Sequence, residues 1–512
     1  SRAAAIAAAR SYLQRQHLNL AGYRVAAALA PQVTTAAAHQ IFTAAGRDAT
    51  IRAYGKAVPA LAWKVRWFRP LQPDELTVWI SAAGGVAGFE RDIADSAPGA
   101  APALPQAEAL ARRALAQAGV DLSGLQLQSA AQQTRAARTD TTIVWQANAA
   151  APGGVDYRVA ARLLGGQLGG WRAAWHVPEA ARRAYVRTTL AGSLLGFLRV
   201  LLIALAIALV CWRAYQFTRR QAAPWRAVLL WSATAGVVMA VTTLNRLPVL
   251  NLRYPNTIPW GAWLVFVAVA AVTALITGFL ISAVLLAAAR HAAPAAWSGL
   301  AQAATRRAWA ADALAAGLLA LAWMAGWQRW RGQINSILHR WGSLTLPTVA
   351  AGNGGWPGLG TALGAGLHAI WLAAFLAVLF TGAMRLWRQR QWVWLAAAFA
   401  LLSLGTLPAV HSLPGFGLEL GLAVAGWGLA LGFAALFLRG NALAYLSAAV
   451  LAGLVPAAAA ACSAQPRYWH AAGFALFGLA VIWLVWLGWQ AAREYRDRPR
   501  PAPPSAALRA GR

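Results

Sequence analysis

The sequence is poor in acidic residues, lysine and cysteine, and each shortage excludes a class of protein. Asp and Glu number 15 against 45 Lys and Arg, and only 12% of residues are charged, about half the roughly 25% of a soluble domain. Both cysteines, Cys211 and Cys462, lie in apolar runs, which excludes a disulfide framework or a structural zinc motif. P-loop, glycine-rich dinucleotide and Gly-x-Ser-x-Gly motifs are also missing, so no such nucleotide-binding or hydrolase site is indicated.

The net charge of +30 does not indicate a nucleic-acid partner. The basic residues are almost all arginine, with Lys56 and Lys64 as the lysines, and they are scattered between apolar runs. A nucleic-acid footprint would gather them on one soluble face. Short, arginine-rich loops retained on the cytoplasmic side of a membrane explain the charge better.

Long apolar runs begin at Leu190 and occupy the rest of the chain. The sequence is 59% hydrophobic and contains 27 tryptophans, many near the ends of these runs, where a membrane interface favours them. Each run is long enough to cross about 30 Å of hydrocarbon as a helix. They predict an α-helical polytopic membrane domain over 189–490 with about nine spans, at 190–212, 227–247, 260–289, 308–327, 357–383, 391–410, 415–437, 441–461 and 471–490.

Arginine in the connections predicts the orientation of these spans. Alternate connections, together with the C-terminal tail, hold seventeen arginines on one side and six on the other. The richer side is expected to be cytoplasmic, which makes the chain a multi-pass protein of a bacterial inner membrane with its N-terminal domain extracytoplasmic. A disordered, basic, proline-rich tail is expected over 491–512. The chain starts at Ser1 without methionine, which leaves a preceding signal or a tenth helix open.

The first 188 residues predict an extracytoplasmic α+β domain made of two similar modules, at about 1–98 and 103–188. Each has a stretch with helical spacing followed by segments rich in Trp, Val, Ile and Thr, with Gly-Gly pairs as turns. The arrangement resembles PepSY units in architecture. The expected helices are 3–17 and 106–118, and the expected strands are 62–68, 75–81, 85–90, 141–147, 155–163 and 170–176.

Five segments in collinear order resemble long bacterial members of the CAAX-protease and bacteriocin-processing (CPBP) family. The resemblance is best over residues 1–260 and continues more weakly after them. The segments are AWKVRWFR from Ala62, GFE from Gly88, RTDTTIVW from Arg138, VPE from Val177, and LNRLP from Leu244 with Tyr254 after it.

Members of the CPBP family are intramembrane metalloproteases, and the resemblance implies that fold and ancestry here. Their signature is Glu-Glu-x-x-x-Arg, Phe-x-x-x-His and His-x-x-x-Asn/Asp on separate helices. Such glutamates and histidines can hold a zinc ion or activate its water, and a second glutamate can act as base. Buried in a bilayer, these groups are costly unless they serve function.

The sequence departs from this signature at each motif. No Glu-Glu pair occurs, and the helix that should carry it contains His368. The second motif corresponds to LPAVH, in which Leu407 replaces Phe and His411 is kept, followed by Glu419. The third falls near Asn441, where no histidine occurs. The resemblance therefore implies a catalytically inactive relative that binds a membrane substrate, with an external domain that contacts a protein partner.

Two other functions stay open at this point. In the first, His411, Glu419 and His368 form a rearranged site of an active intramembrane endopeptidase, with zinc as the cofactor. In the second, the chain is a transporter component, although no inverted repeat is visible. Each candidate also has a structural interpretation: His411 as an interfacial residue, His368 bonded to a neighbouring helix, and Glu419 bonded to another helix or to Arg385 or Arg439.

Two further charged residues have structural interpretations only. Asp312 is expected to pair with Arg306 or Arg307 near the membrane interface. Arg199 lies inside the first apolar run, where its side chain either reaches the interface or marks a later start of the helix.

Overall fold

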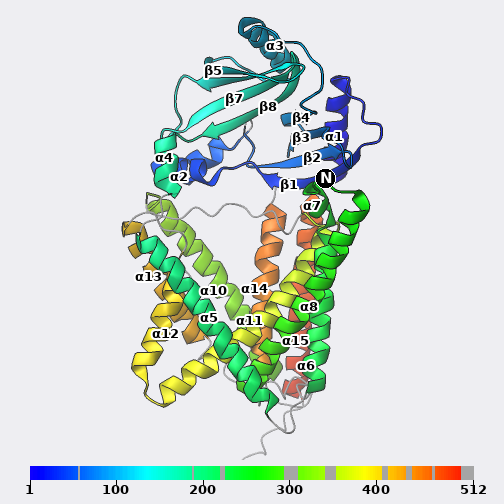
Figure 1. The fold of residues 1–512 in the computed structure, drawn as a ribbon. Helices are drawn as coiled ribbons and strands as arrows, with labels where there is room; N and C mark the ends of the chain where they lie inside the picture. The colour runs from blue at the N-terminus through cyan, green and yellow to red at the C-terminus, as the bar shows by residue number, and fades with distance from the viewer. Residues whose placement is uncertain are drawn as a thin grey trace, which may run out of the picture.

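The chain forms an N-terminal α+β domain that lies on one end of a bundle of long helices (Figure 1). The computed structural model describes residues 1–55, 58–186, 190–219, 225–292, 309–340, 353–405, 407, 413–433, 441–463 and 468–496.

One antiparallel sheet of eight strands forms the framework of the N-terminal domain, in the order β1-β2-β3-β4-β8-β7-β6-β5. Each half of the domain contributes four consecutive strands, and the two halves join where β4 pairs with β8. The strands are β1 (Arg24–Pro31), β2 (Leu61–Phe68), β3 (Glu75–Ser81), β4 (Val86–Asp92), β5 (Leu125–Thr134), β6 (Thr139–Ala147), β7 (Asp156–Leu164) and β8 (Gln167–His176).

Helices at equivalent places in the two halves cover the sheet. Helix α1 (Arg2–Arg15) packs on β1, β2 and β3, and α3 (Leu104–Gln117) packs on β6, β7 and β8. Their apolar side chains share one core with the strands, and Trp171 of the second half donates a 3.2 Å hydrogen bond to the Tyr12 hydroxyl of the first. The domain is completed by α2 (Thr35–Ala53) and α4 (Glu179–Val186).

The six strands expected from aromatic and β-branched residues are strands β2, β3, β4, β6, β7 and β8. Strands β1 and β5 were not expected, because RVAAALAP and LQLQSAAQQT consist mainly of alanine and glutamine, which have low strand propensity. Pairing with a strong neighbour, β2 or β6, overrides that preference. Helix α2 was also missed; its φ of 79° at Gly46 interrupts the helical spacing.

The chain is a multi-pass membrane protein. Among the described residues, eight helices are long and apolar enough to cross a membrane. The apolar run expected at 391–410 contains α12 (Trp392–Gly405), which has 14 residues; the remainder of that run extends into residues outside the description, so the count of nine stays a prediction. The eight are α5 (Leu190–Thr218), α6 (Trp225–Asn245), α8 (Trp260–Ala292), α10 (Trp309–Ile337), α11 (Pro357–Arg388), α13 (Leu413–Phe433), α14 (Ala442–Ser463) and α15 (Tyr468–Arg496).

The last helix corrects one expected boundary. Helix α15 continues to Arg496, so residues 491–496, expected in a disordered tail, are helical. Glu494 gives the reason, because its carboxylate accepts hydrogen bonds from the backbone N–H groups of Ala310 (2.9 Å) and Ala311 (3.4 Å). A carboxylate is stabilised at the N-terminus of a helix, and this one ties α15 to the start of α10.

The domain and the bundle meet through the short helix α7 (Leu247–Leu252) and the loop after it. Arg66 on β2 forms an ion pair with Glu75 and donates to the carbonyls of Leu252 (3.1 Å) and Tyr254 (2.6 Å). Tyr254 is buried beneath Phe68. The segments that begin at Ala62 and Leu244 and carry the family resemblance therefore meet at this junction.

A second part of the junction is the segment just before α11, at Asn353 and Gly354. The side-chain amide of Asn353 accepts from the N–H of Leu29 and donates to its carbonyl, both at 2.6 Å, and so pairs with β1. Arg2 donates to the carbonyls of Asn353 (2.9 Å) and Gly354 (2.8 Å). A side chain at Gly354 would collide with the amide of Asn245. The sheet edge at β1 is thus attached to the bundle.

Candidate functional site: an intramembrane cavity

Glu419 lies near the start of α13, on the domain side of the bundle, and is only 3% exposed. Arg331 of α10 donates to its carboxylate at 3.0 Å. This ion pair agrees with the structural interpretation of Glu419 as a contact between helices. Arg331 was not among the partners expected from the sequence, and Arg439 lies outside the described residues. Arg331 was instead counted as a loop arginine, because the sequence does not show that α10 extends to Ile337.

The other residues of the rearranged protease site are not brought to Glu419 by the described part of the chain. His411 lies outside the described residues. His368 is on an exposed position of α11. Within the described ranges, no three His, Cys, Asp or Glu side chains are grouped so that they could hold a metal ion. The rearranged site therefore stays a prediction.

The two further charged residues of the membrane half have different outcomes. Arg199 in α5 donates a hydrogen bond to the carbonyl of Leu407, between α12 and α13, and so bonds to protein. Asp312 is exposed near the start of α10, and its expected partners Arg306 and Arg307 lie outside the described residues.

A cavity of about 540 Å³ lies between α5, α10, α11, α12, α13 and α14. We call it the intramembrane cavity. Its size falls within the range of about 300–1,000 Å³ typical of small-molecule sites. Most of its lining is leucine, alanine and aromatic side chains, and its notable members are Arg213, Trp323, Arg385, Phe399, Trp427 and Tyr445.

Two polar groups at this cavity have no hydrogen-bond partner among the described residues. These are the hydroxyl of Tyr445, whose side chain is 3% exposed, and the indole N–H of Trp323. A buried polar group without a partner costs about 1–3 kcal/mol. Both groups can donate a hydrogen bond, and both are buried beneath the cavity surface.

Two arginines add positive charge to the same cavity. Arg213 lies near the end of α5 and Arg385 near the end of α11, and both line the cavity. Neither forms an ion pair with any carboxylate that the structure describes. The cavity therefore combines a large apolar wall with hydrogen-bond donors and two cations.

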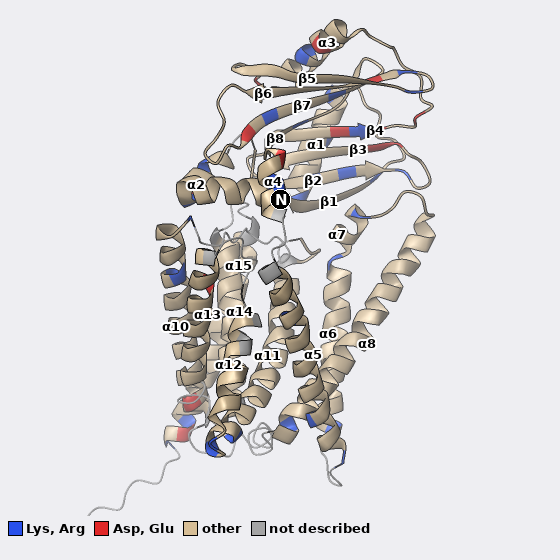
Figure 2. Ribbon diagram, turned by 60° about the vertical axis from the view of Figure 1, so that its left-hand side comes forward, with Lys and Arg blue, Asp and Glu red and all other residues tan. Residues whose placement is uncertain are grey.

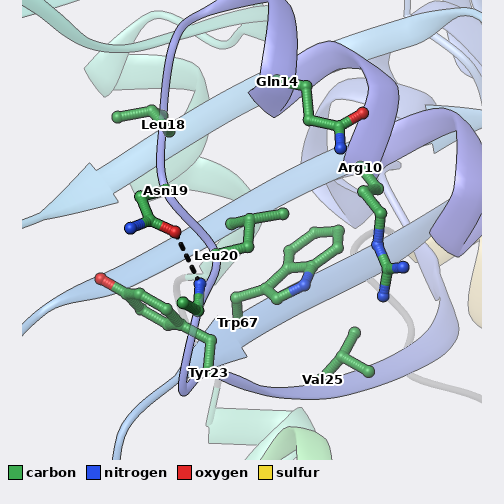
Figure 3. Close-up of a pocket in the computed structure, with 9 residues that line it drawn as sticks. Arg10, Gln14, Leu18, Asn19, Leu20, Tyr23, Val25 and Trp67 are labelled. Atoms are coloured by element: carbon green, nitrogen blue, oxygen red, sulfur yellow. Dashed lines mark hydrogen bonds between the residues drawn. The ribbon is translucent and has the colours of Figure 1, made fainter.

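A second hollow lies on the N-terminal domain between α1 and the edge of the sheet (Figure 3). It measures about 420 Å³ and is lined by Arg10, Gln14, Asn19, Tyr23 and Trp67, among others. The backbone N–H of Ala21, which lines this hollow, donates to the side-chain oxygen of Asn19 at 2.9 Å. The side chains of Arg10, Gln14 and Asn19 are exposed to solvent. Polar groups in contact with water need no ligand, so this hollow is the weaker candidate.

The intramembrane cavity is not visible in the sequence, although one of its lining residues, Tyr445, lies in the segment that corresponds to the third protease motif. The segment compared with the third protease motif begins at Asn441, whose side chain caps α14 by accepting from the N–H groups of Leu443 (3.0 Å) and Ala444 (3.2 Å). Tyr445 follows one turn later. A lone tyrosine in an apolar run is visible in a sequence, but its missing partner is a property of the packed helices.

Comparisons with known proteins add no assignment to this geometry. No family model matches the chain, and neither a curated protein nor a solved structure matches it.

Proposed function

We propose that this chain is a membrane-embedded binding protein that takes the apolar chain of a membrane amphiphile into the intramembrane cavity. The observation that carries the proposal is an apolar cavity of about 540 Å³ that two arginines, Arg213 and Arg385, border near one end. Apolar walls with a few directed polar groups are typical of ligand sites between helices. The walls would hold the chain, and the two guanidinium groups would bind oxygen atoms near its head.

The same proposal fits a diverged, non-catalytic relative of CPBP proteases. Glu419, the buried acidic residue of α13, is neutralised by Arg331, which supports a structural role. The junction attaches the N-terminal domain to both α7 and the start of α11, and α11 lines the cavity. Through this attachment, a protein partner bound to the domain would sense whether the cavity is occupied.

A leucine at Gly382 is expected to block the cavity without harming the fold. Gly382 of α11 lines the cavity, and a side chain added there would meet no described atom within 4 Å. We expect Gly382→Leu to reduce ligand binding about tenfold or more, since overfilling a site costs about 1–3 kcal/mol. The measurement is photolabelling of the full chain, in phosphatidylcholine vesicles, by a phospholipid with a diazirine in its acyl chain.

Gly366→Leu is the matched control. Gly366 is on the same helix, has the same open space at its Cβ position and is not part of the cavity lining. The amount of photolabel on peptides from α10 and α14 should be lower in Gly382→Leu than in the wild type, and it should be unchanged in Gly366→Leu. Equal labelling of the two variants would mean that the lipid touches only the outer surface, and the proposal would be abandoned.

We also propose that the N-terminal domain faces the extracytoplasmic side of a bacterial inner membrane. The excess of arginine at the bundle end remote from the domain supports this orientation, and Figure 2 shows basic residues gathered there. Arg113→Cys on exposed α3 should then react with a membrane-impermeant maleimide in intact cells, whereas Arg388→Cys should react only after permeabilisation. Cys211 is exposed and Cys462 is half-buried near the end of α14, so both are first replaced by serine. The reverse pattern would invert the orientation.

A further inference from the structure

The lining of the intramembrane cavity is unbalanced in both charge and hydrogen-bonding type. Arg213 and Arg385 come from different helices, and each guanidinium acts electrostatically on the other. No acidic side chain is among the lining residues. Arginine and tryptophan donate hydrogen bonds and cannot accept them. A ligand that complements this lining is negatively charged and rich in acceptor oxygens.

From this imbalance we infer that the occupant of the intramembrane cavity carries a phosphate monoester head group held by Arg213 and Arg385. The inference rests on the proposed function and specifies its ligand. A phosphate monoester carries about −1.5 to −2 charges near neutral pH, which matches two guanidinium groups. The planar guanidinium also binds phosphate oxygens in a bidentate manner that few other side chains reproduce.

The position of the arginines indicates which leaflet supplies the ligand. Helix α5 starts just after α4 of the N-terminal domain, and α11 starts just after the junction at Gly354. Both run away from the domain, and their arginines lie close to their far ends. Figure 2 shows basic residues at this end of the bundle. The head group therefore enters from the leaflet remote from the domain, and the acyl chain extends into the bundle.

Thermal unfolding of the full chain in a nonionic detergent tests this inference. The probes are dioleoyl phosphatidate, dioleoyl phosphatidylglycerol, dioleoyl phosphatidylcholine and oleate, each titrated into the micelles. A ligand that binds the folded state raises the unfolding temperature according to its concentration and affinity. We expect the largest rise with phosphatidate, a smaller one with phosphatidylglycerol, and none with phosphatidylcholine at the same concentration.

Arginine variants test the site itself. Arg213→Gln and Arg385→Gln should each weaken phosphatidate binding about tenfold or more, as expected for hydrogen bonds to a charged group. Arg388→Gln is the matched control, because Arg388 is exposed at the same end of α11 and does not line the cavity. Arg213→Lys should retain part of the affinity, which separates loss of charge from misfolding.

The possible results separate the inference from the proposed function. Equal rises with phosphatidate and phosphatidylcholine, both abolished by Gly382→Leu, would keep the cavity as a binding site and overturn the phosphate head group. A stronger effect of oleate than of phosphatidate would overturn it in favour of a carboxylate. An equal loss of phosphatidate affinity in Arg213→Gln and Arg388→Gln would show that anionic lipid is attracted to the basic surface in general. This result would also overturn the phosphate site. If no lipid changed the unfolding temperature and Gly382→Leu left photolabelling unchanged, both the phosphate head group and the proposed function would be overturned.

Discussion

Replacing Arg331 with methionine is expected to destabilise the helical bundle by up to about 3–5 kcal/mol. The change removes the guanidinium that lies 3.0 Å from the carboxylate of Glu419 and leaves that carboxylate 3% exposed between helices. A buried carboxylate that loses the guanidinium paired with it is strongly destabilising. Unfolding of the full chain in mixed dodecyl maltoside and SDS micelles would measure the effect.

Two variants sharpen this test. Arg329→Met, an exposed arginine on the same helix, should change stability by no more than about 0.5 kcal/mol. Arg331→Met combined with Glu419→Leu should recover most of the loss, because an apolar pair of similar volume often replaces a buried ion pair without cost. A small loss of unfolding free energy in Arg331→Met would show that the ion pair with Arg331 is not what stabilises buried Glu419. Zinc that copurifies with the wild type and disappears in the double variant would revive the protease alternative.

Replacing Arg138 with methionine is expected to destabilise the N-terminal domain by about 3–5 kcal/mol. Arg138 is 5% exposed and its Nε donates to the carboxylate of Asp140 at 2.8 Å. Its Nη1 donates to the carbonyls of Ala94 (2.6 Å) and Ala97 (2.9 Å) in the connection between the two halves. The substitution therefore leaves the buried carboxylate with Arg135 at 3.3 Å as its remaining cation and frees the connection, which is a larger effect than the loss of one hydrogen bond.

Hydrogen exchange of the full chain, followed by mass spectrometry, would show this effect locally. Peptides from β6, β7 and the connection at 93–103 should lose protection, and those from α8 and α14 should keep it. Arg183→Met is the control, since its ion pair with Glu179 is exposed and such a pair is worth about 0.3–0.5 kcal/mol. Unchanged protection in Arg138→Met would mean that Arg135, which also contacts Asp140 at 3.3 Å, carries the carboxylate alone.

The fold could be anticipated from the sequence wherever one physical signal dominated. Long apolar runs marked the helices, and aromatic with β-branched residues marked six strands. Strands β1 and β5 lack these residues and exist because neighbouring strands offer them partners. The junction could not be anticipated either, since the Asn353 side chain pairs with a backbone 324 positions away. Distant pairing of this kind leaves no local pattern.

The candidate site was anticipated less well than the fold. Glu419 was recognised because acidic residues are rare in the membrane half, and its burial agrees with that reasoning. Its partner Arg331 and the arginines Arg213 and Arg385 were all read as loop residues that report orientation. Their second role depends on where each helix ends and which neighbour it faces. A cavity is a property of several helices together, so no single run could reveal it.

The pairing of β4 with β8 has a consequence for the symmetry of the N-terminal domain. Each is the last strand of its half, and they lie antiparallel, with Phe89 opposite Trp171 and the carbonyl of Phe89 placed where a side chain on Gly170 would lie. A strand that pairs with its own counterpart in this way is the signature of a two-fold axis. Joining both halves in one chain makes that contact independent of concentration, and it allows the halves to differ. Helix α2 and the hydrogen bond between β1 and Asn353 belong to the first half, whereas the second half leads through α4 into α5.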